Sequence, residues 1–369
     1  MFTSIQVTHE PRPVAKRVPL HGRLHAFRRR IVAWCVRRLL PRPPNVVGAG
    51  QLPRAGIHRI LLCRPNHRLG NTVLTTPLMA ELERQFPGAE VDVLGSGAAC
   101  RGIYAGFASL GQLFLLERRA LAHPLSTLAT LRKLRAKRYD LVIHAAAGSS
   151  SGRIAAAMAR ARFQLHADAA GMPPSAHFAA RPVQALRWAL GADPSLPPPP
   201  PDLRLTAAER ETARHTLRQV LQGDAGEERT PVLVVFPNAT GSKCLDAAWW
   251  RIFLDELLRH VGPRRVVELV PADGRSRLDH AFPTYFTSDP RRLAAFIEAA
   301  GTYVSADCGV MHLAAATGAT TIGLFGATDP RRYAPYGGRN AGFACGDGDA
   351  TATAFQVARH LLAGGGTDS

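Results

Sequence analysis

Three residues near the C-terminal end of the sequence, Asp307, Gly309 and His312, combine a carboxylate, a glycine and an imidazole within six positions. They follow an apolar segment, residues 302–306, that is expected to form a strand, and Gly309 begins a short helix of small residues. At such a junction the helix N-terminus presents unpaired N–H groups and a partial positive charge. These residues therefore predict a binding site for an anionic or hydroxyl-rich ligand.

A second group of polar residues follows an apolar strand expected over residues 57–63. Arg64, His67 and Arg68 lie in the loop after it, where a parallel α/β sheet would place them at the mouth of a ligand crevice. Their charge suits carboxylate or phosphate groups. The alternative is a set of solvated loop charges.

The segments that surround these residues are expected to alternate between strand and helix along the whole sequence. In the first half, the expected strands are 57–63, 90–94, 112–116, 141–145 and 163–166, with helices at 72–86 and 125–138. Pro77 either kinks the first of these helices or marks its true first turn. In the second half, the expected strands are 232–236, 265–270, 302–306 and 320–325, with helices at 206–221, 246–260, 290–300 and 351–362. This order predicts an α/β fold with doubly wound, Rossmann-like parallel sheets.

A proline-rich stretch divides the two halves. Residues 193–202 include five consecutive prolines, 197–201, which are typical of a semi-rigid spacer. A chain of 369 residues also exceeds one ordinary core. We therefore expect an N-terminal extension at 1–50, one domain at 51–192, a linker at 193–202 and a second domain at 203–369, with the ligand in the cleft between the domains.

Composition limits the function classes. The net charge of +18 implies an anionic partner, and no apolar run approaches the roughly 20 residues that span a bilayer. The N-terminus lacks the pattern of a signal peptide. The six cysteines contain no CxxC pair, so they predict reduced thiols of a cytoplasmic protein.

The basic charge is concentrated at the N-terminus. Residues 1–47 hold ten Lys or Arg and one acid, Glu10, and residues 24–40 have the apolar spacing of an amphipathic helix. Such a helix is a candidate for lying on anionic lipid. The alternative is that its apolar stripe packs on the body of the protein.

Other motifs argue against ATP hydrolysis and nicotinamide binding. Gly241-Ser-Lys-Cys lacks the pattern of an ATP-binding P-loop, and Gly95-x-Gly97 does not complete the GxGxxG that binds dinucleotides. Asp347-Gly-Asp349 has the spacing of a metal-binding pair but lies in a Gly-rich loop, where chance explains it better. Aromatic residues are only 7%, so we expect no nucleic-acid partner.

Four blocks of sequence begin at Ile60, Val235, Asp307 and Gly323, and together they span about residues 57–337. The blocks read Ile60-Leu-Leu-Cys-Arg-Pro-Asn-His-Arg-Leu-Gly-Asn, Val235-Phe-Pro-Asn-Ala-Thr-Gly-Ser-Lys, Asp307-Cys-Gly-Val-Met-His and Gly323-Leu-Phe-Gly-Ala-Thr-Asp-Pro. In this order, the blocks resemble glycosyltransferase family 9, the lipopolysaccharide core heptosyltransferases.

The resemblance implies a GT-B architecture and an inverting, metal-independent sugar transfer. The donor would be a nucleotide-sugar, typically ADP-heptose, held by the C-terminal domain. The acceptor would be a lipid-linked, phosphorylated core oligosaccharide at the cytoplasmic face of the inner membrane, presented by the N-terminal domain. No cofactor and no metal are expected, because cationic side chains stabilise the departing diphosphate.

The resemblance also assigns residues. Lys243 matches the family's phosphate-binding lysine; without that block it would read as an ordinary exposed lysine. His312 is either a donor ligand or a capping or core histidine. The full donor-binding set is Asn238, Thr240, Ser242, Lys243, Asp307, Cys308, Gly309, Val310, Met311 and His312, in which Cys308 and Val310 replace the family's Ser and Pro.

The acceptor side departs from the family at its catalytic position. The expected acceptor-binding residues are Arg64, His67, Arg68 and Gly70, but Asn71 stands where the family has the Asp that acts as general base. An amide cannot take that proton. Either His67 serves, since an imidazole pKa of about 6.5 suits a base, or another acid or water does, or the protein binds without efficient transfer. Two functions thus stay open: a glycosyltransferase, and a catalytically weak protein that binds sugar-nucleotide or glycolipid.

Overall fold

The computed structural model describes residues 45–363, except 118–122, 146–148, 170, 173–174, 176, 223–229 and 346–347. These residues fall within one compact unit of the chain, Arg42–Ser369. The expected basic helix at 24–40, most of the expected 1–50 extension, and Asp347 lie outside the described residues. Among the described helices, none combines the length and apolarity that a bilayer crossing requires.

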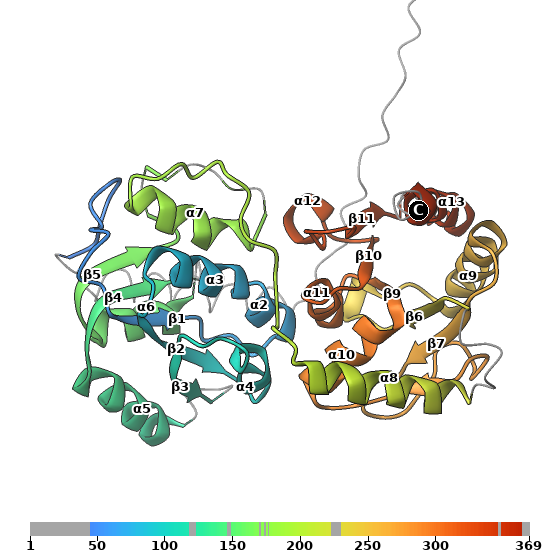
Figure 1. Ribbon diagram of the computed structural model, residues 1–369, viewed down its shortest axis with the longest axis horizontal. Helices are drawn as coiled ribbons and strands as arrows, with labels where there is room; N and C mark the ends of the chain where they lie inside the picture. Colours follow the sequence, from blue (N-terminus) through green and yellow to red (C-terminus); the bar gives the residue numbers. More distant parts are fainter. Residues whose placement is uncertain are drawn as a thin grey trace, which may run out of the picture. The chain divides into compact units, whose positions relative to one another are not determined.

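The first sheet has five parallel strands in the order β3-β2-β1-β4-β5 (Figure 1). Its strands are β1 Arg59–Cys63, β2 Glu90–Ser96, β3 Leu110–Leu116, β4 Arg138–His144 and β5 Arg160–His166. Its helices are α2 Leu69–Val73, α3 Thr76–Gln85, α4 Ala99–Tyr104, α5 Pro124–Ala136, α6 Ser150–Met158 and α7 Ala180–Ala189.

Alternation along β1 explains how this sheet is covered on both faces. Successive side chains of a strand point to opposite faces. Ile60 and Leu62 therefore join the core formed with α3 and α7, whereas Leu61 and Cys63 join the core formed with α5 and α6. Because both faces are covered, the central strand is apolar at nearly every position.

The second sheet has six parallel strands in the order β11-β10-β9-β6-β7-β8. Its strands are β6 Val232–Phe236, β7 Arg265–Leu269, β8 Thr284–Tyr285, β9 Gly301–Ala306, β10 Thr320–Phe325 and β11 Ala341–Ala344. Its helices are α8 Ala207–Leu221, α9 Ala247–Val261, α10 Pro290–Ala300, α11 Gly309–Ala315, α12 Pro330–Tyr333 and α13 Ala350–Ala363, with a 3-10 turn at Gly241–Lys243. The same alternation sends Leu233 and Val235 toward α9 and α13, and Val234 toward α8 and α10.

The α/β fold with two doubly wound parallel sheets is confirmed. The stretch expected to be helical over 72–86 is two helices, α2 and α3, and Pro77 lies in the first turn of α3, as the second of its two interpretations expects. A proline is tolerated there because the first N–H groups of a helix have no partner within it. Asp349 accepts from Ala352 N at the start of α13, so this residue caps a helix.

The proline-rich stretch between α7 and α8 has no regular secondary structure and is held from both sides. Arg187 of α7 donates through Nη1 to the carbonyl oxygen of Leu196, 2.6 Å away. Tyr336, which follows α12, donates its hydroxyl to the carbonyl oxygen of Pro199, at 2.9 Å. The domain boundaries expected from the sequence stay predictions.

Candidate functional site

Lys243 and Asp307 meet at the carboxyl ends of two paired strands. β6 leads to the turn that carries Lys243, β9 leads to Asp307, and the two strands are hydrogen-bonded neighbours. Lys243 Nζ donates to Asp307 Oδ2 at 2.5 Å. Thr328 Oγ1, in the loop after β10, donates to the same oxygen at 2.6 Å. The carboxylate is 4% exposed, so its two partners satisfy a charge that burial would otherwise penalise.

The ion pair fixes the ammonium without using all of its hydrogen-bonding capacity. An ammonium group carries three N–H donors, and Asp307 takes one of them. The Lys243 side chain keeps 31% of its surface exposed, and its Nζ lies 5.9 Å from the centre of the Tyr333 ring. A partly exposed, oriented ammonium can bind an anionic ligand.

The neighbouring donor candidates differ in exposure. Thr240 and Ser242 are exposed beside Lys243. Asn238 accepts from Arg277 Nε at 2.7 Å, while its own Nδ2 is buried and has no hydrogen-bond partner among the described residues. A buried amide N–H without a partner is costly, which makes Asn238 a candidate for donating to a ligand.

His312 lies against α2, the short helix of the first half that contains Gly70. A Cβ atom built on Gly70 would come within 2.5 Å of His312 Cδ2 and 3.3 Å of Gly309 Cα, so glycine permits this approach. Burial lowers the pKa of His312 to about 4; the charge of Asp307 opposes that shift, while His177 and Lys243 add to it. His312 is therefore neutral at neutral pH.

The rest of the Asp307–His312 segment is buried or half-buried. Met311 is fully buried, and its sulfur occupies the space where a side chain at Gly323 would lie, so Met311 packs in the core. Cys308, in the place of the family's serine, lies with its sulfur 3.7 Å from Ser305 Oγ, and burial raises the pKa of its thiol. Val310 and Gly309 are half-buried.

Arg64 is a buried cation. Its side chain follows β1 and is 4% exposed, and its guanidinium carbon lies 4.9 Å from the centre of the Phe178 ring. The Nε atom has no hydrogen-bond partner, and the described part of the chain offers Arg64 no ion pair. Burial lowers its pKa to about 10. The interpretation of Arg64 as a solvated loop charge is therefore wrong, whereas His67 and Arg68 are exposed.

Asn71 stands in the short helix α2, directly after Gly70, and is half-buried. The Gly70 contact thus brings Asn71 to the region of α11 and His312. The roles predicted for Asn71, His67 and the donor set stay predictions.

Sequence reasoning missed Thr328, Tyr333, His177 and Phe178. His177 Nε2 donates to the Ala334 carbonyl oxygen at 3.0 Å, because its Nδ1 accepts from Ala179 N. Phe178 contacts both Arg64 and Tyr333 by its ring. Thr328 stands inside the fourth sequence block, which was a usable signal; the 177–178 segment carries none.

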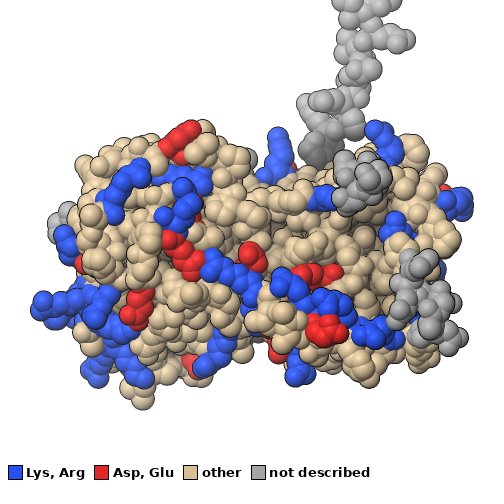
Figure 2. Space-filling model, viewed as in Figure 1, with Lys and Arg blue, Asp and Glu red and all other residues tan. Residues whose placement is uncertain are grey.

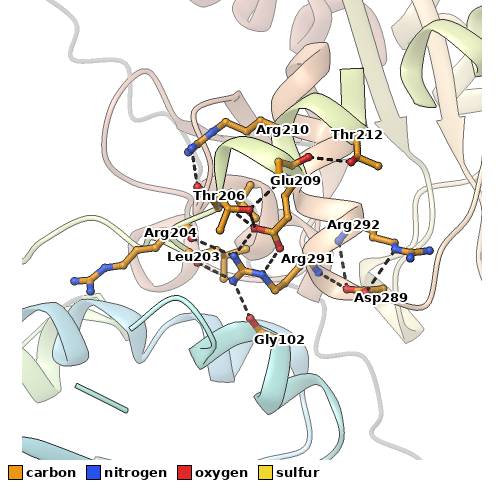
Figure 3. Close-up of polar contacts among 12 residues, drawn as sticks. Gly102, Leu203, Arg204, Thr206, Glu209, Arg210, Thr212, Asp289, Arg291 and Arg292 are labelled. Carbon is orange, nitrogen blue, oxygen red and sulfur yellow. Dashed lines mark hydrogen bonds and ion pairs between the residues drawn. The ribbon is translucent and has the colours of Figure 1, made fainter. Parts of the chain in front are cut away.

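Outside the candidate site, Arg291 also links an element of the first half to elements of the second half (Figure 3). This residue of α10 donates from Nη1 to the carbonyl oxygens of Gly102, at 3.1 Å, and Leu203, at 2.9 Å. It also pairs with Glu209, which completes the capping box of α8 with Thr206. The guanidinium thus ties α4 to the start of α8 through charge-assisted hydrogen bonds.

Comparison with known proteins relates this chain to a family of glycosyltransferases. The family model described as glycosyltransferase family 9 (heptosyltransferase) matches residues 291–354, which include Asp307, His312, Thr328 and Tyr333. The resemblance to glycosyltransferase family 9 is confirmed. No curated protein sequence matches the chain significantly.

Solved structures share the fold. A family 9 glycosyltransferase from Veillonella parvula is 16% identical, with 85% of this chain and 91% of that chain covered and a TM-score of 0.65. Escherichia coli heptosyltransferase WaaC with ADP is 18% identical, with 83% and 99% covered and a TM-score of 0.62. E. coli ADP-heptose lps heptosyltransferase II is 16% identical, with 83% and 98% covered and a TM-score of 0.59. The GT-B fold is confirmed, and the family match supports glycosyl transfer as the activity.

Proposed function

We propose that this chain is an inverting glycosyltransferase that moves heptose from ADP-heptose to a lipid-linked acceptor of the lipopolysaccharide-core type. The observation that carries the proposal is the Lys243–Asp307–Thr328 cluster at the carboxyl ends of neighbouring strands. Two solved WaaC structures with this fold hold ADP and ADP-2-deoxy-2-fluoro heptose. A nucleotide-sugar is therefore the donor class that the site fits best.

Lys243 is the group proposed to hold the diphosphate. When the bond from the sugar C1 to the phosphate oxygen breaks, negative charge develops on that oxygen, and a preorganised cation stabilises it. Asp307 orients the ammonium in advance, so little reorganisation is needed at that moment. Because Lys243 supplies the positive charge, the proposed transfer uses no metal ion.

Arg64 is the group proposed to bind the acceptor. A buried guanidinium without an ion pair is unfavourable in the free protein, and an anionic group of a ligand would relieve that cost. A phosphate on the acceptor fits this requirement. Arg68, exposed in the same loop, is placed to add to the positive potential.

The acceptor hydroxyl must lose its proton as its oxygen bonds to C1 from the face opposite the diphosphate. His67 is the side chain proposed to accept that proton, because the amide of Asn71 cannot. Asn71 is then left to orient the acceptor. The same amide favours a second candidate function, a protein that binds the nucleotide-sugar or glycolipid and transfers poorly.

Helix α5 offers a surface for peripheral membrane association. Arg132, Lys133 and Arg135 are exposed on it, and Leu125 at its start is 82% exposed. Figure 2 shows basic side chains gathered at the lower left, where Figure 1 places α5. Basic residues beside an exposed apolar side chain suit anionic lipid. Co-sedimentation with anionic vesicles tests this: the full chain should bind, and both a chain that starts near residue 50 and a full chain with Arg132, Lys133 and Arg135 changed to Gln should bind less. Equal binding by the triple variant would exclude α5 as the contact.

A transfer assay distinguishes the two candidate functions. The full chain is incubated with ADP-heptose and a heptose-deficient core glycolipid, and both ADP and the glycosylated lipid are quantified. The glycosyltransferase proposal expects equal amounts of both products, lost in Lys243→Ala and kept in Arg218→Ala, an exposed arginine of α8. Tight binding of ADP-heptose without product would favour the binding protein instead.

A further inference from the structure

His144, His166 and Asp168 form a cluster at the carboxyl edge of the first sheet. His144 ends β4, His166 ends β5, and the two residues are direct partners in the parallel register. Asp168 follows two residues later. One ligand atom from each of the three side chains lies within 4.8 Å of the other two. None of these residues was given a role in the sugar transfer.

The hydrogen bonds of His144 determine where its lone pair lies. His144 Nε2 is 3.2 Å from the carbonyl oxygen of Ser149. A carbonyl oxygen only accepts hydrogen bonds, so the proton of the neutral ring stands on Nε2 and the lone pair stands on Nδ1. A histidine whose other ring nitrogen donates to a backbone carbonyl is the usual arrangement of a metal ligand.

Two imidazole nitrogens in this cluster are buried and unpaired. His144 is 0% exposed and His166 is 9% exposed. His144 Nδ1 and His166 Nε2 each lack a hydrogen-bond partner within the part of the chain that the structure describes. Leaving two buried polar atoms unpaired is costly, and a shared ligand for both would remove that cost.

Asp168 supplies the negative charge and Arg153 orients it. Arg153 Nη2 donates to Asp168 Oδ2 at 3.1 Å, which leaves the second carboxylate oxygen for a ligand. The positive charge of Arg153 opposes a cation, and the carboxylate lies between the two. Hydrogen bonds to a ligating carboxylate are a regular feature of metal sites.

We propose that His144, His166 and Asp168 bind one divalent transition-metal ion, with Zn²⁺ as the best fit. Two imidazoles and one carboxylate are ligands that zinc accepts, and three protein ligands leave a fourth position open. Zinc binds such ligands at about 2.0–2.2 Å, so the donor atoms must approach to roughly 3.5 Å of one another. In the structure these donor atoms lie within 4.8 Å of one another, so metal binding requires modest side-chain rotations.

The site belongs to the first sheet and stands apart from the proposed donor cluster. β4 pairs with β1, and His144 is the register partner of Cys63, the residue before Arg64. The metal would thus lie one strand from the proposed acceptor contact. It takes no part in the transfer step proposed above, and the inference does not depend on that step.

Zinc binding to the full chain tests the site. The protein is stripped with a chelator and dialysed against Zn²⁺, and bound metal is measured by elemental analysis with the affinity from a competing chelator. We expect one ion per chain. His166→Gln and Asp168→Asn should each weaken the affinity at least about 10-fold, since removing even an outer-shell partner costs about 10–100-fold. His215→Ala, an exposed histidine of α8, is the matched control and should bind as the wild type does.

Cobalt distinguishes the ligands. Co²⁺ in the site should show visible ligand-field bands without thiolate charge transfer, because the proposed ligands are nitrogen and oxygen. Circular dichroism of the two variants checks that they fold, and neither changes the fully buried His144. A strong thiolate band, binding that survives both substitutions, or no binding at micromolar Zn²⁺ would each overturn the proposal.

Discussion

Gly70 lies so close to His312 that a Cβ atom at position 70 would stand 2.5 Å from His312 Cδ2. The two residues lie in helices that follow strands of different sheets: Gly70 is in α2, after β1 of the first sheet, and His312 is in α11, after β9 of the second sheet. This contact brings α2, which carries Asn71 and follows the loop of Arg64, to the segment that carries Asp307. It therefore couples the proposed acceptor side to the proposed donor side.

Replacing Gly70 should damage both stability and transfer. In Gly70→Ala the buried His312 ring must move, and overpacking of this kind costs about 1–3 kcal/mol of the free energy of unfolding. Displacement of α2 against α11 should lower kcat by about 100-fold, since catalysis is sensitive to shifts of 1 Å. Denaturant unfolding and steady-state kinetics measure the two effects.

The matched control is Gly318→Ala, where the added Cβ would meet Glu298 at an ordinary 3.7 Å. This variant should keep wild-type stability and kcat. If Gly70→Ala behaves like the control, the close approach of Gly70 and His312 is not needed for function.

Arg64 should contribute to acceptor binding and not to stability. Arg64→Met removes a buried guanidinium that has no ion pair among the described residues, and it should leave the free energy of unfolding unchanged or raise it by up to about 4 kcal/mol. The KM for a phosphorylated acceptor should rise, because the anion loses its partner, while the affinity for the donor stays the same. Kinetics with phosphorylated and dephosphorylated acceptor make the comparison, and Arg68→Met serves as the exposed control. A less stable variant with an unchanged KM would show that Arg64 is structural.

The stability of the protein should depend on His312 below neutral pH. Its folded pKa of about 4 lies below the unfolded value of 6.5 because burial disfavours the charged ring. The unfolded chain therefore binds more protons in this range, so stability present above pH 6.5 is lost as pH falls toward 4. The loss amounts to roughly 3 kcal/mol for this group.

The comparison of wild type with His312→Gln isolates this contribution. His144, whose pKa burial also lowers to about 4, stays in both proteins, so its effect cancels. The difference between their unfolding free energies, measured from pH 7 to pH 4, should shrink as pH falls. A difference that does not vary with pH would mean that His312 titrates normally in the folded state.

Substitutions of Asn71 should affect the rate of transfer and not the affinity for the donor. Asn71→Ala should leave the donor affinity nearly unchanged, because the donor groups lie in the second sheet. Asn71→Asp supplies a carboxylate where the resembling family has its base, and it should raise kcat by about 10²-fold or more if proton removal limits the rate. His67→Gln should lower kcat in the wild-type background only. An unchanged rate in His67→Gln would exclude His67 as the base, and an unchanged rate in Asn71→Asp would show that a carboxylate at position 71 does not assist proton removal.

Local patterns predicted most helices and every described strand except β8 and β11, but not the contacts between distant residues. The apolar runs of β1 and β6 were readable because both faces of each strand are buried. The break at Pro77 could be placed in two ways, and only packing decided between them. Short elements such as α4 and α12 carry too few residues for a periodic signal.

The sequence indicated Lys243, Asp307 and Arg64 as candidate site residues, but it indicated neither Thr328 nor Phe178, and it did not show which residues pair. Lys243 and Asp307 are 64 residues apart, and their ion pair depends on β6 and β9 being neighbours. The burial of Arg64 depends on Phe178, which comes from a segment with no motif of its own. Sequence order along the chain does not contain the order of strands within a sheet, so these contacts required the structure.

Calorimetric titration with ADP-heptose measures whether Lys243 belongs to a donor site. The full chain should bind one ADP-heptose per chain, Lys243→Ala should bind it at least about 10-fold more weakly because a charge-assisted contact is lost, and Lys133→Ala should match the wild type. ADP alone should compete for the same site. No binding of ADP-heptose below millimolar concentration, or equal affinity in Lys243→Ala, would contradict the assignment of the donor site.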